Sequence, residues 1–376
     1  MTGVDRVEFA YLSHLLTLET PLFGLVRTAA GFLLLNRAGA QGVAALVMGG
    51  VLRKADLLSR LTNRKNPVRA RAEASVRALA VARAPRNMLG WLLRRLPDGA
   101  SYLNVGHSNL TDPVLHVLHR RFRVTVLVHD CIPLDHPGYA RPDTVDGFAA
   151  KLTAVAAHAD LVIHLTAVAR NLTEAHLRRF GRLPAGVVSP LGVPVPQPDP
   201  TALPATLDLT APYYIALGTI EPRKNHALLV QVWQQLGRSG APPRLYVVGN
   251  RGWADPALFD QLAATPGVQV LSGLSDGAVA ALLQGAAALL FPSLAEGFGL
   301  PPVEAAALGT PVIASHLPVL HEVMGDYPVY LDAADSYSWV ETIEAQGRGA
   351  LRQGDIGLRR VPPTWEAHFN TVLNLA

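Results

Sequence analysis

Residues 291–315 read FPSLAEGFGLPPVEAAALGTPVIAS, a stretch in which two glutamates flank a loop rich in glycine and proline. Two prolines lie between Glu296 and Glu304, and proline is tolerated only in the first turn of a helix. The spacing therefore predicts that Glu296 lies in the loop after a buried strand and that Glu304 lies in the first turn of the next helix. Gly309 is a favourable residue to end that helix.

Apolar runs and helical stretches alternate along the chain on both sides of this segment. Strands that alternate with helices are typical of βαβ units, so the sequence predicts an α/β fold with parallel sheets. Buried strands are expected at residues 213–219, 244–250, 268–271, 288–293, 311–315 and 328–332 in the C-terminal half, and at 101–108, 123–130 and 160–166 in the N-terminal half.

The start of the chain departs from this pattern. MTGVDRVE runs from a turn at Gly3 into a helix expected at residues 7–16, with no strand before it. Residues 21–37 have the composition of two strands. We expect an N-terminal domain that lacks its first strand, and a truncated start of the chain is the alternative.

The chain has 376 residues, which is long for one core and indicates two domains. Residues 190–212 contain seven prolines and should form an extended linker that does not become helical. We therefore assign residues 1–190 to an N-terminal domain, 191–212 to the linker and 213–365 to a C-terminal domain.

Basic residues are concentrated between positions 53 and 95, where 12 lysines and arginines accompany only Asp56 and Glu73. Three interpretations stay open for this segment: a solvated helical face, contact with anionic lipid, or contact with a phosphorylated acceptor. Binding to nucleic acid is disfavoured, because neither a recognition fold nor a pattern of stacking aromatic residues accompanies the charge.

Cys131 is the one cysteine, so a disulfide framework or a zinc cluster within the chain is excluded. A single thiol is typical of a reducing cytoplasm. The longest apolar run near the start, residues 39–52, is too short to span a bilayer, and we discern no signal peptide. We expect a cytoplasmic protein whose membrane contact, if it has one, is peripheral at the inner face.

Both glutamates of the opening segment should lie at the ligand-binding edge, because ligands of parallel α/β sheets bind beyond the carboxyl ends of the strands. The loop amides of residues 297–300 precede a helix N-terminus, which is a natural place for an anion. The alternative for Glu304 alone is a first-turn acid that faces its own helix dipole.

A second candidate site is GTIEPRKNHALL, residues 218–229. Arg223 and Lys224 come directly before a helix expected to start at Asn225, where the helix dipole disfavours cations by about 0.3–1 kcal/mol each. A bound anion such as a diphosphate would explain the placement. The alternative is two solvated cations on a loop.

A third candidate site is LVHDCIP, residues 127–133, where His129 and Asp130 end a buried strand of the other half. A histidine there suits action on a substrate hydroxyl or phosphate, and a structural hydrogen bond is the alternative. Asn104 and His107 in NVGH follow a neighbouring strand and could line the same place. The sequence has no dinucleotide fingerprint, Walker loop or zinc-protease motif, so we expect neither a metal nor a cofactor.

Residues 218–230, 271–283 and 291–315 together resemble glycosyltransferase family 4, the group 1 transferases of GT-B architecture. That architecture has two Rossmann-like domains facing across a cleft. TGVDRVEFAYL and HDCIP are similar to elements of bacterial members that build surface polysaccharides. TWEAHFNTVL, residues 364–373, resembles the helix that crosses back to the N-terminal domain, so residues 366–376 are assigned to that domain.

The resemblance implies a nucleotide diphosphate sugar as donor, a glycan or a polyprenyl-linked acceptor, and transfer of a hexose with retention and without metal. It implies that the diphosphate contacts Arg223, Lys224 and Gly3, the ribose contacts Glu304, and the base lies near Leu274. It also implies that the transferred sugar contacts Glu296 and the backbone of Gly297, Phe298, Gly299 and Leu300. His129 would lie near the anomeric centre, with Asn104, His107 and Asp130 on the acceptor side. The alternatives are a sugar-nucleotide epimerase and a catalytically silent binding protein of the same fold.

Overall fold

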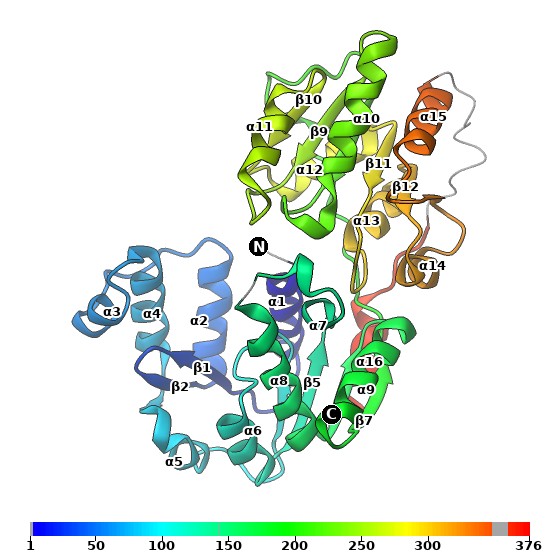
Figure 1. Ribbon diagram of the computed structural model, residues 1–376. Helices are drawn as coiled ribbons and strands as arrows, with labels where there is room; N and C mark the ends of the chain where they lie inside the picture. The colour runs from blue at the N-terminus through cyan, green and yellow to red at the C-terminus, as the bar shows by residue number, and fades with distance from the viewer. Residues whose placement is uncertain (1–2, 142, 348–359) are drawn as a thin grey trace.

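The computed structural model describes residues 3–141, 143–347 and 360–376. The chain folds into two α/β halves, one above the other in Figure 1, and each half is built on its own parallel sheet. Two Rossmann-like layers of this kind confirm the expected α/β, GT-B architecture.

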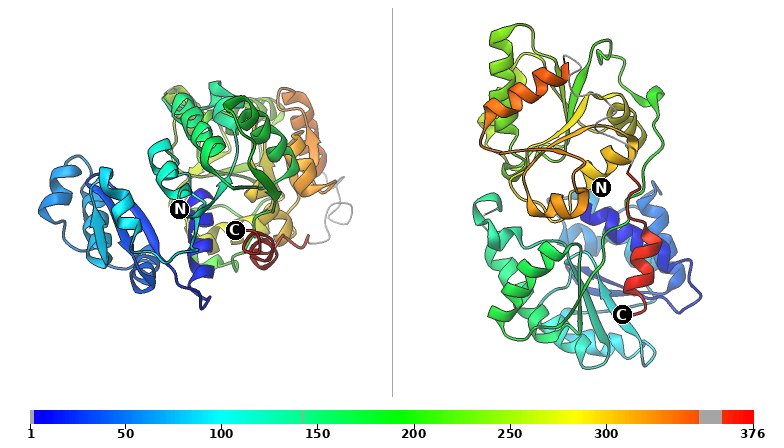
Figure 2. Two further views of the ribbon diagram at one scale, coloured as in Figure 1. Left: turned by 90° about the horizontal axis from the view of Figure 1, so that it is seen from below. Right: turned by 90° about the vertical axis from the view of Figure 1, so that its right-hand side faces the viewer.

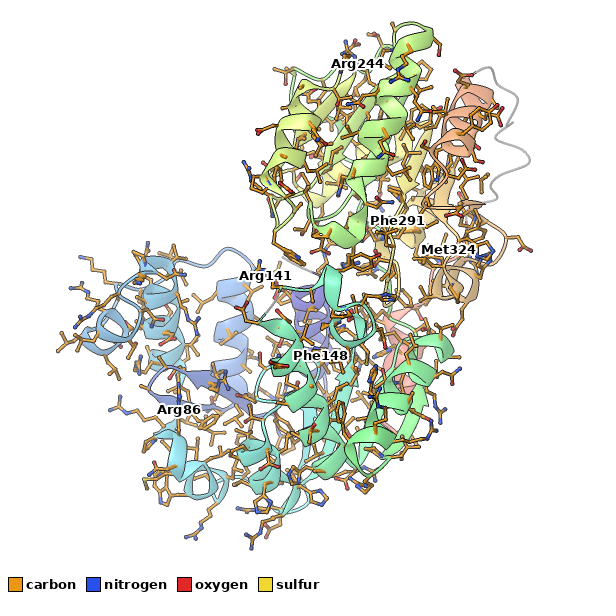
Figure 3. All side chains as sticks on the ribbon, in the orientation of Figure 1. Arg86, Arg141, Phe148, Arg244, Phe291 and Met324 are labelled. Carbon is orange, nitrogen blue, oxygen red and sulfur yellow. The ribbon has the colours of Figure 1, made fainter. Side chains whose placement is uncertain are left out.

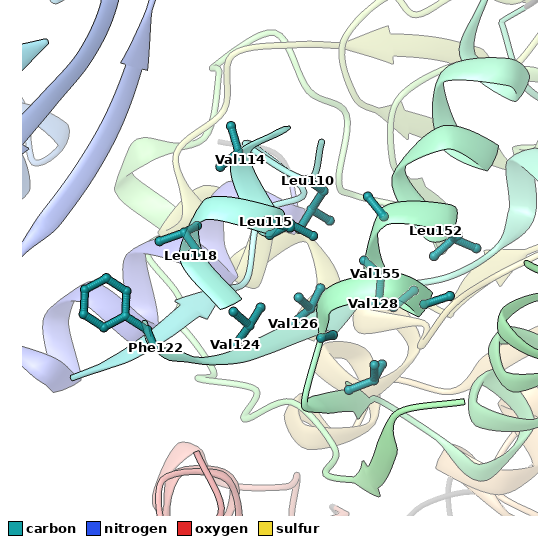
Figure 4. Packing of buried hydrophobic residues seen from close by; sticks show 14 of the residues in the cluster. Leu110, Val114, Leu115, Leu118, Phe122, Val124, Val126, Val128, Leu152 and Val155 are labelled. Atoms are coloured by element: carbon teal, nitrogen blue, oxygen red, sulfur yellow. The ribbon is translucent and has the colours of Figure 1, made fainter. Parts of the chain in front are cut away.

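The N-terminal half contains a four-stranded sheet in the order β4-β5-β6-β7, with all neighbours parallel. Its core forms where α6 and α8 pack on the buried β5, as Figure 4 shows for Leu115, Val126 and Val155. The elements are β4 (Ser101–Asn104), α6 (Asp112–His119), β5 (Arg123–Val128), α7 (Ile132–Asp135), α8 (Thr144–His158), β6 (Leu161–His164), α9 (Ala167–Phe180) and β7 (Ala185–Val188).

Helix α1 (Gly3–Leu15) opens the described part of the chain, and no strand precedes it there. Its buried residues Val7 and Tyr11 belong to an apolar cluster that also contains Leu127 of β5 and Ile163 of β6. Helix α1 therefore packs on the four-stranded sheet of the N-terminal half.

A side lobe, residues 24–93, projects from the N-terminal half in Figures 1 and 2. The expected pair of strands in residues 21–37 is confirmed, but the strands pair antiparallel in a separate three-stranded sheet of order β1-β2-β3. The two-residue connection between β1 and β2 allows only antiparallel pairing. The lobe comprises β1 (Gly24–Thr28), β2 (Gly31–Leu35), α2 (Arg37–Val47), α3 (Leu57–Thr62), α4 (Pro67–Leu79), β3 (Ala82–Ala84) and α5 (Leu89–Leu93).

The C-terminal half contains a six-stranded parallel sheet in the order β10-β9-β8-β11-β12-β13. The strand order reverses between β8 and β11, so the loops after these two strands meet at the topological switch point. The elements are β8 (Tyr213–Leu217), α10 (His226–Ser239), β9 (Arg244–Val248), α11 (Pro256–Ala264), β10 (Val268–Leu271), α12 (Asp276–Gly285), β11 (Ala288–Phe291), α13 (Leu300–Leu308), β12 (Val312–Ser315), α14 (Pro318–Met324), β13 (Val329–Leu331) and α15 (Ser336–Gly347).

The connection between the two sheets is mostly extended, as its prolines predict. The expectation that it forms no helix is too strict, because Pro200–Ala202 makes one 3-10 turn. The amide of Asp199 donates to the Gly277 carbonyl of α12 at 2.9 Å. The connection is thus fixed against the C-terminal half near this turn.

Helix α16 (Trp365–Val372) returns to the N-terminal half, which confirms the expected crossing helix (Figure 2, right). The Tyr11 hydroxyl and Nε2 of His368 lie 2.6 Å apart, and the Ser189 hydroxyl lies 3.0 Å from the other ring nitrogen. Phe369 packs edge-on against Tyr11. His368 of α16 therefore connects α1 with Ser189, the residue that follows β7.

The two halves also contact each other away from α16. Glu322 of α14 accepts hydrogen bonds from the amides of Ala167 and Val168, the first two residues of α9, at 2.6 and 2.9 Å. The guanidinium of Arg141 lies 4.8 Å from the Trp253 ring, and Figure 3 shows Arg141 where the N-terminal half faces the other. Among the described residues, no helix combines the length and apolar content that crossing a bilayer requires.

Candidate active site

Arg223 and Lys224 lie on a 3-10 turn, Pro222–Lys224, that follows β8. Helix α10 begins one residue later than expected, at His226, because Asn225 adopts a left-handed conformation with φ 53°. Only 8% of Lys224 is exposed. The alternative of two solvated cations is therefore wrong.

Glu296 faces these two cations from the loop after β11. Its Oε1 lies 2.6 Å from Nζ of Lys224 and 2.8 Å from Nη1 of Arg223. Lys224 also lies over the Phe291 ring, with Nζ 4.5 Å from its centroid. Ion pairs thereby connect the loops after β8 and β11 at the switch point of the sheet.

Glu221 completes this charge cluster and was not anticipated from the sequence. Its Oε1 lies 2.6 Å from Nε of Arg223, and Arg223 also donates to the Ala295 carbonyl at 3.1 Å. The protein's own carboxylates thus pair with both cations in front of α10 and hold them in place. The sequence analysis explained the two cations by a bound anion. The structure shows that Glu221 and Glu296 already account for their placement.

The carboxyls around Arg223 respond differently to burial. Burial alone would raise the pKa of Glu296, but the charges of Arg223 and Lys224 lower it to about 2. Burial raises the pKa of Asp130 and that of Glu221, and Arg223 opposes the rise at both. Glu296 is therefore the carboxyl of the cluster that is most firmly ionised.

Gly297 brings the Glu296 loop against the other half of the protein. A methyl group added at Gly297 would lie 2.5 Å from the His129 carbonyl oxygen and 2.9 Å from the Asp130 Cβ. Only glycine fits this approach without displacement. The sequence motifs of the two halves, HDCIP and EGFG, therefore meet at this point.

His129 and His107 are held inside the N-terminal half. Nε2 of His129 lies 2.7 Å from the Val105 carbonyl, and its ring packs edge-on against His107 with centroids 5.1 Å apart. Burial lowers the pKa of His129, and burial with the neighbouring His129 lowers the pKa of His107 to about 3. Both rings are therefore neutral at physiological pH, and His129 already has the structural bond that was its alternative explanation.

Asn104 lies at the end of β4 near these rings. Its Nδ2 donates to the Tyr102 hydroxyl at 2.9 Å and to the Ser108 carbonyl, whereas its buried Oδ1 has no hydrogen-bond partner among the described residues. The side-chain bonds of Asn104 thus run to its own neighbourhood, and its amide oxygen stays without a partner among the described residues.

Glu304 lies in the second turn of α13, not in the first turn as expected. Gly299, with φ 91°, starts the helix ahead of the two prolines, so Glu304 falls one turn further in. Its Oε1 accepts from Nη1 of Arg6 at 2.9 Å, and Arg6 also bonds Asp276 at 2.8 Å. The explanation of Glu304 as a first-turn acid is therefore wrong.

Arg6 and Asp276 were not singled out from the sequence. Arg6 lies in α1 of the N-terminal half, and its two acidic partners lie at α12 and α13 of the other half. Burial raises the pKa of Glu304, and the charge of Arg6 opposes the rise. Pairs separated by more than 250 residues leave no spacing signal, so sequence patterns alone do not reveal them.

The remaining candidate donor residues differ in what they present to a ligand. Gly3 starts α1, where an added methyl would lie 3.7 Å from Leu300. Phe298 is 4% exposed and packs in the apolar cluster between the halves, so only its backbone is available to a ligand. Leu274, just before α12, packs partly buried against the C-terminal core.

A pocket of about 440 Å³ lies beside the Glu296 loop, at the carboxyl ends of β11, β12 and β13. None of the candidate donor residues lines it. Its lining residues are Ser293, Leu294, Ser315, His316, Leu317, Tyr330, Leu331, Asp332 and Ala333.

Residues 204–345 match the model of the family described as glycosyl transferases group 1. The C-terminal half is a group 1 glycosyl transferase domain. The match covers the charge cluster of Arg223, Lys224 and Glu296 and also Glu304, so this geometry belongs to the group 1 domain.

Curated relatives are bacterial mannosyltransferases. The chain is 31% identical over 221 residues to the serotype-specific mannosyltransferase WbdA of Escherichia coli, which covers 54% of this chain and 27% of WbdA. It is 34% identical over 137 residues to the O-antigen chain mannosyltransferase RfbU of Salmonella typhimurium, which covers 35% of this chain and 37% of RfbU. The aligned regions thus span well under half the length of these two relatives.

Solved structures share the fold of both halves. TarM matches with a TM-score of 0.55 at 14% identity, over 78% of this chain and 57% of TarM. A mutant of S. aureus TarM in complex with fondaparinux, alpha-GlcNAc-glycerol and UDP matches with a TM-score of 0.54 at 12% identity, over the same shares of the two chains. At these identities the likeness establishes the GT-B arrangement that surrounds the group 1 domain.

Proposed function

We propose that the protein is a glycosyltransferase that moves a hexose from a nucleotide diphosphate sugar to a glycan or polyprenyl-linked acceptor. The observation that carries this proposal is the buried cluster of Arg223, Lys224 and Glu296 at the switch point of the group 1 domain. The loop that carries Glu296 lies against His129 and Asp130 of the other half, so donor and acceptor sides meet there.

The cluster suits the departure of a nucleotide diphosphate. Negative charge grows on the leaving phosphate, and two preorganised cations near the start of α10 stabilise that charge without reorganising. Glu296 holds the ammonium and guanidinium in position before the donor arrives, since its Oε1 contacts both. Its other carboxylate oxygen forms no ion pair with a described residue and is the one we assign to a hydroxyl of the transferred sugar.

We assign the remaining residues along the length of an extended nucleotide diphosphate sugar. Glu304 is assigned to the ribose, with Arg6 occupying Oε1 only. Gly3 and the backbone of residues 297–300 approach the diphosphate and the sugar, and Leu274 lies near the base. Retention of configuration without a metal remains part of the proposal, supported by the family resemblance.

The names of the relatives support a more specific proposal for the donor and the acceptor. Both WbdA and RfbU are named as mannosyltransferases, and RfbU is named for the O-antigen chain. We therefore propose mannose as the transferred hexose and a growing surface polysaccharide as the acceptor. The UDP in the TarM complex supports nucleotide binding by this fold.

The test is a panel of nucleotide sugars, including GDP-mannose and UDP-glucose, with three readouts: thermal shift, release of nucleotide diphosphate, and mass of the acceptor product. We expect one donor to stabilise the protein and to lose its sugar to an acceptor glycan. If no nucleotide sugar or nucleotide diphosphate binds, the proposal is wrong.

The same panel separates the two alternatives. An epimerase would convert the donor in the absence of any acceptor, and its product would keep the nucleotide. A silent binding protein would show the thermal shift without turnover, and Lys224→Ala would then weaken binding without any activity to lose.

A further inference from the structure

Helix α3 buries a serine and exposes three leucines, the reverse of the usual arrangement. Asp56 caps the helix by accepting from the amide of Ser59 at 2.7 Å, and Ser59 itself is fully buried. Leu57, Leu58 and Leu61 are 76%, 41% and 52% exposed. A helix of a soluble domain normally buries its leucines, so this outward face is unpartnered.

Exposed apolar side chains are concentrated around this helix. The structure describes 18 large apolar side chains that are exposed, and ten of them lie between Val47 and Trp91. This range runs from the end of α2 to α5 in the side lobe. The ten are Val47, Met48, Val51, Leu57, Leu58, Leu61, Val68, Val81, Met88 and Trp91. Single exposed apolar residues are ordinary, but a gathering of this kind marks an interaction surface.

Positive charge surrounds the same leucines. Lys54, Arg60, Arg64 and Lys65 are exposed and form no ion pair with any residue that the structure describes. The only two acids of the segment are already engaged, since Asp56 bonds Arg77 at 3.0 Å and Glu73 bonds Arg69 at 3.4 Å. The positive charge near the leucines is therefore not compensated within the lobe.

We propose that the α3 surface, defined as Leu57, Leu58, Arg60, Leu61, Arg64 and Lys65, docks onto an anionic lipid bilayer. Leucines that enter the boundary between headgroups and acyl chains, combined with cations at the level of the lipid phosphates, are what such an interface recognises. Long basic side chains bury their stems while their charged ends stay at the phosphates.

Other occupants fit these side chains less well. A second copy of the chain would place Arg60, Arg64 and Lys65 against the same cations. A phosphorylated acceptor or a nucleic acid would satisfy the charge but leave the three leucines in water. A protein partner remains an outcome that the experiment must separate.

The position of the lobe is compatible with docking. Figures 1 and 2 show α3 at its outer end, on the side of the N-terminal half away from α9 and α16 and remote from the C-terminal half. Contact through α3 therefore does not cover the charge cluster of the group 1 domain. This inference does not depend on the proposed function, because binding to lipid needs no nucleotide and no turnover.

The experiment is sedimentation of the full chain with vesicles, in the absence of nucleotide. One set is phosphatidylcholine alone and the other contains about one third phosphatidylglycerol. Three variants are compared: Leu57→Gln with Leu61→Gln, Arg60→Gln with Arg64→Gln and Lys65→Gln, and a control that changes the exposed Leu172 and Arg238 to Gln elsewhere on the surface. Circular dichroism establishes that each variant is folded, and size-exclusion chromatography gives its oligomeric state.

We expect the unchanged chain and the control to bind the anionic vesicles, with less binding at high salt. Each pair or triple of substitutions on the α3 surface should lower the partition coefficient at least about tenfold. The proposal is overturned if anionic and neutral vesicles bind equally, if neither binds, or if the α3 variants bind like the control. It is also overturned if the leucine substitutions convert an oligomer into a monomer, because the surface then contacts another copy.

Discussion

Glu296 joins two cations through a single carboxylate oxygen, and this arrangement makes its charge more important than its size. An amide at the same place would keep the volume but would leave a buried ammonium and a buried guanidinium short of one negative charge. Removing one partner of a buried ion pair is far more costly than removing an exposed one.

Glu296→Gln should lower turnover at least about tenfold, which corresponds to about 1.4 kcal/mol in the barrier. It should also destabilise the fold by about 3 kcal/mol, because Lys224 and Arg223 lose their shared partner. Steady-state release of nucleotide diphosphate and chemical denaturation measure the two effects. Glu19→Gln, at an exposed position, is the control and should change neither turnover nor stability. If Glu296→Gln keeps the turnover of the unchanged chain, Glu296 is not part of the active site.

The pH dependence of stability should report the same carboxylate. The pKa of Glu296 is lowered from 4.5 to about 2 in the folded protein, so its stabilising contribution is complete above pH 4.5 and is lost as the pH falls towards 2. The difference in free energy of unfolding between the unchanged chain and Glu296→Gln should therefore be constant at neutral pH and shrink below 4.5. Denaturation curves across this range test it, and a difference that persists to pH 2 would contradict the prediction.

Gly297→Ala should lower activity while the group 1 domain stays folded. The added methyl would lie 2.5 Å from the His129 carbonyl, so the two halves would have to separate where the Glu296 loop contacts His129, the proposed meeting point of donor and acceptor. Turnover and thermal unfolding measure the effect. Gly237→Ala in α10 meets nothing within 4 Å and should stabilise the helix by about 0.5–1 kcal/mol. If both alanines behave alike, close approach at Gly297 has no functional role.

At the scale of elements, α1 and α13 are held together by Arg6. This guanidinium keeps Oε1 of Glu304 occupied, and its charge opposes the rise in the pKa of Glu304 that burial causes. A residue of α1 in the N-terminal half therefore influences the protonation of an acid in the C-terminal half.

Arg6→Ala should weaken nucleotide binding, and more so at acidic pH. Without Arg6, the pKa of Glu304 rises further, so a larger fraction of the carboxyl is protonated as the pH falls and cannot accept two ribose hydrogen bonds. Calorimetric titration with nucleotide diphosphate between pH 5.5 and 8 checks this. Arg244→Ala, which removes an exposed pair with Asp208, is the control, and parallel pH profiles in both variants would argue against a link through Glu304.

The elements themselves were largely readable from the sequence, because buried strands and helix-starting prolines are local signals. The strands around residues 213–217 and 288–291 and the end of α13 at Gly309 lie where the pattern placed them. The predicted position of Glu304 is one turn too early in the helix, because Gly299 with its positive φ lets α13 begin before the two prolines. The partners Glu221 and Arg6 could not be found, since ion pairs across distant loops depend on tertiary packing.

At the scale of the whole molecule, one apolar cluster belongs to both halves. It combines Val7 and Tyr11 of α1, Leu127 of β5, Phe298 of the Glu296 loop and Phe369 of α16. The two sheets are consequently coupled by buried side chains as well as by the connection 191–212.

Phe298→Ala should destabilise the protein by about 3–5 kcal/mol and loosen the junction of the two halves. Proteolysis under native conditions should then cut the connection 191–212 faster. Phe122→Ala removes a side chain of the same size from a core that lies within the N-terminal half alone (Figure 4), and it should not expose the connection in this way. Equal cleavage of the two variants would show that the cluster does not couple the halves.

Glu322 gives the junction a further property. Its carboxylate binds the first two amides of α9, so a helix of one half completes its end with a side chain of the other. Those two amide hydrogens should exchange with deuterated solvent more slowly while the halves remain together. Their exchange rate should therefore report how often the two halves separate, at two positions outside the proposed donor-binding residues.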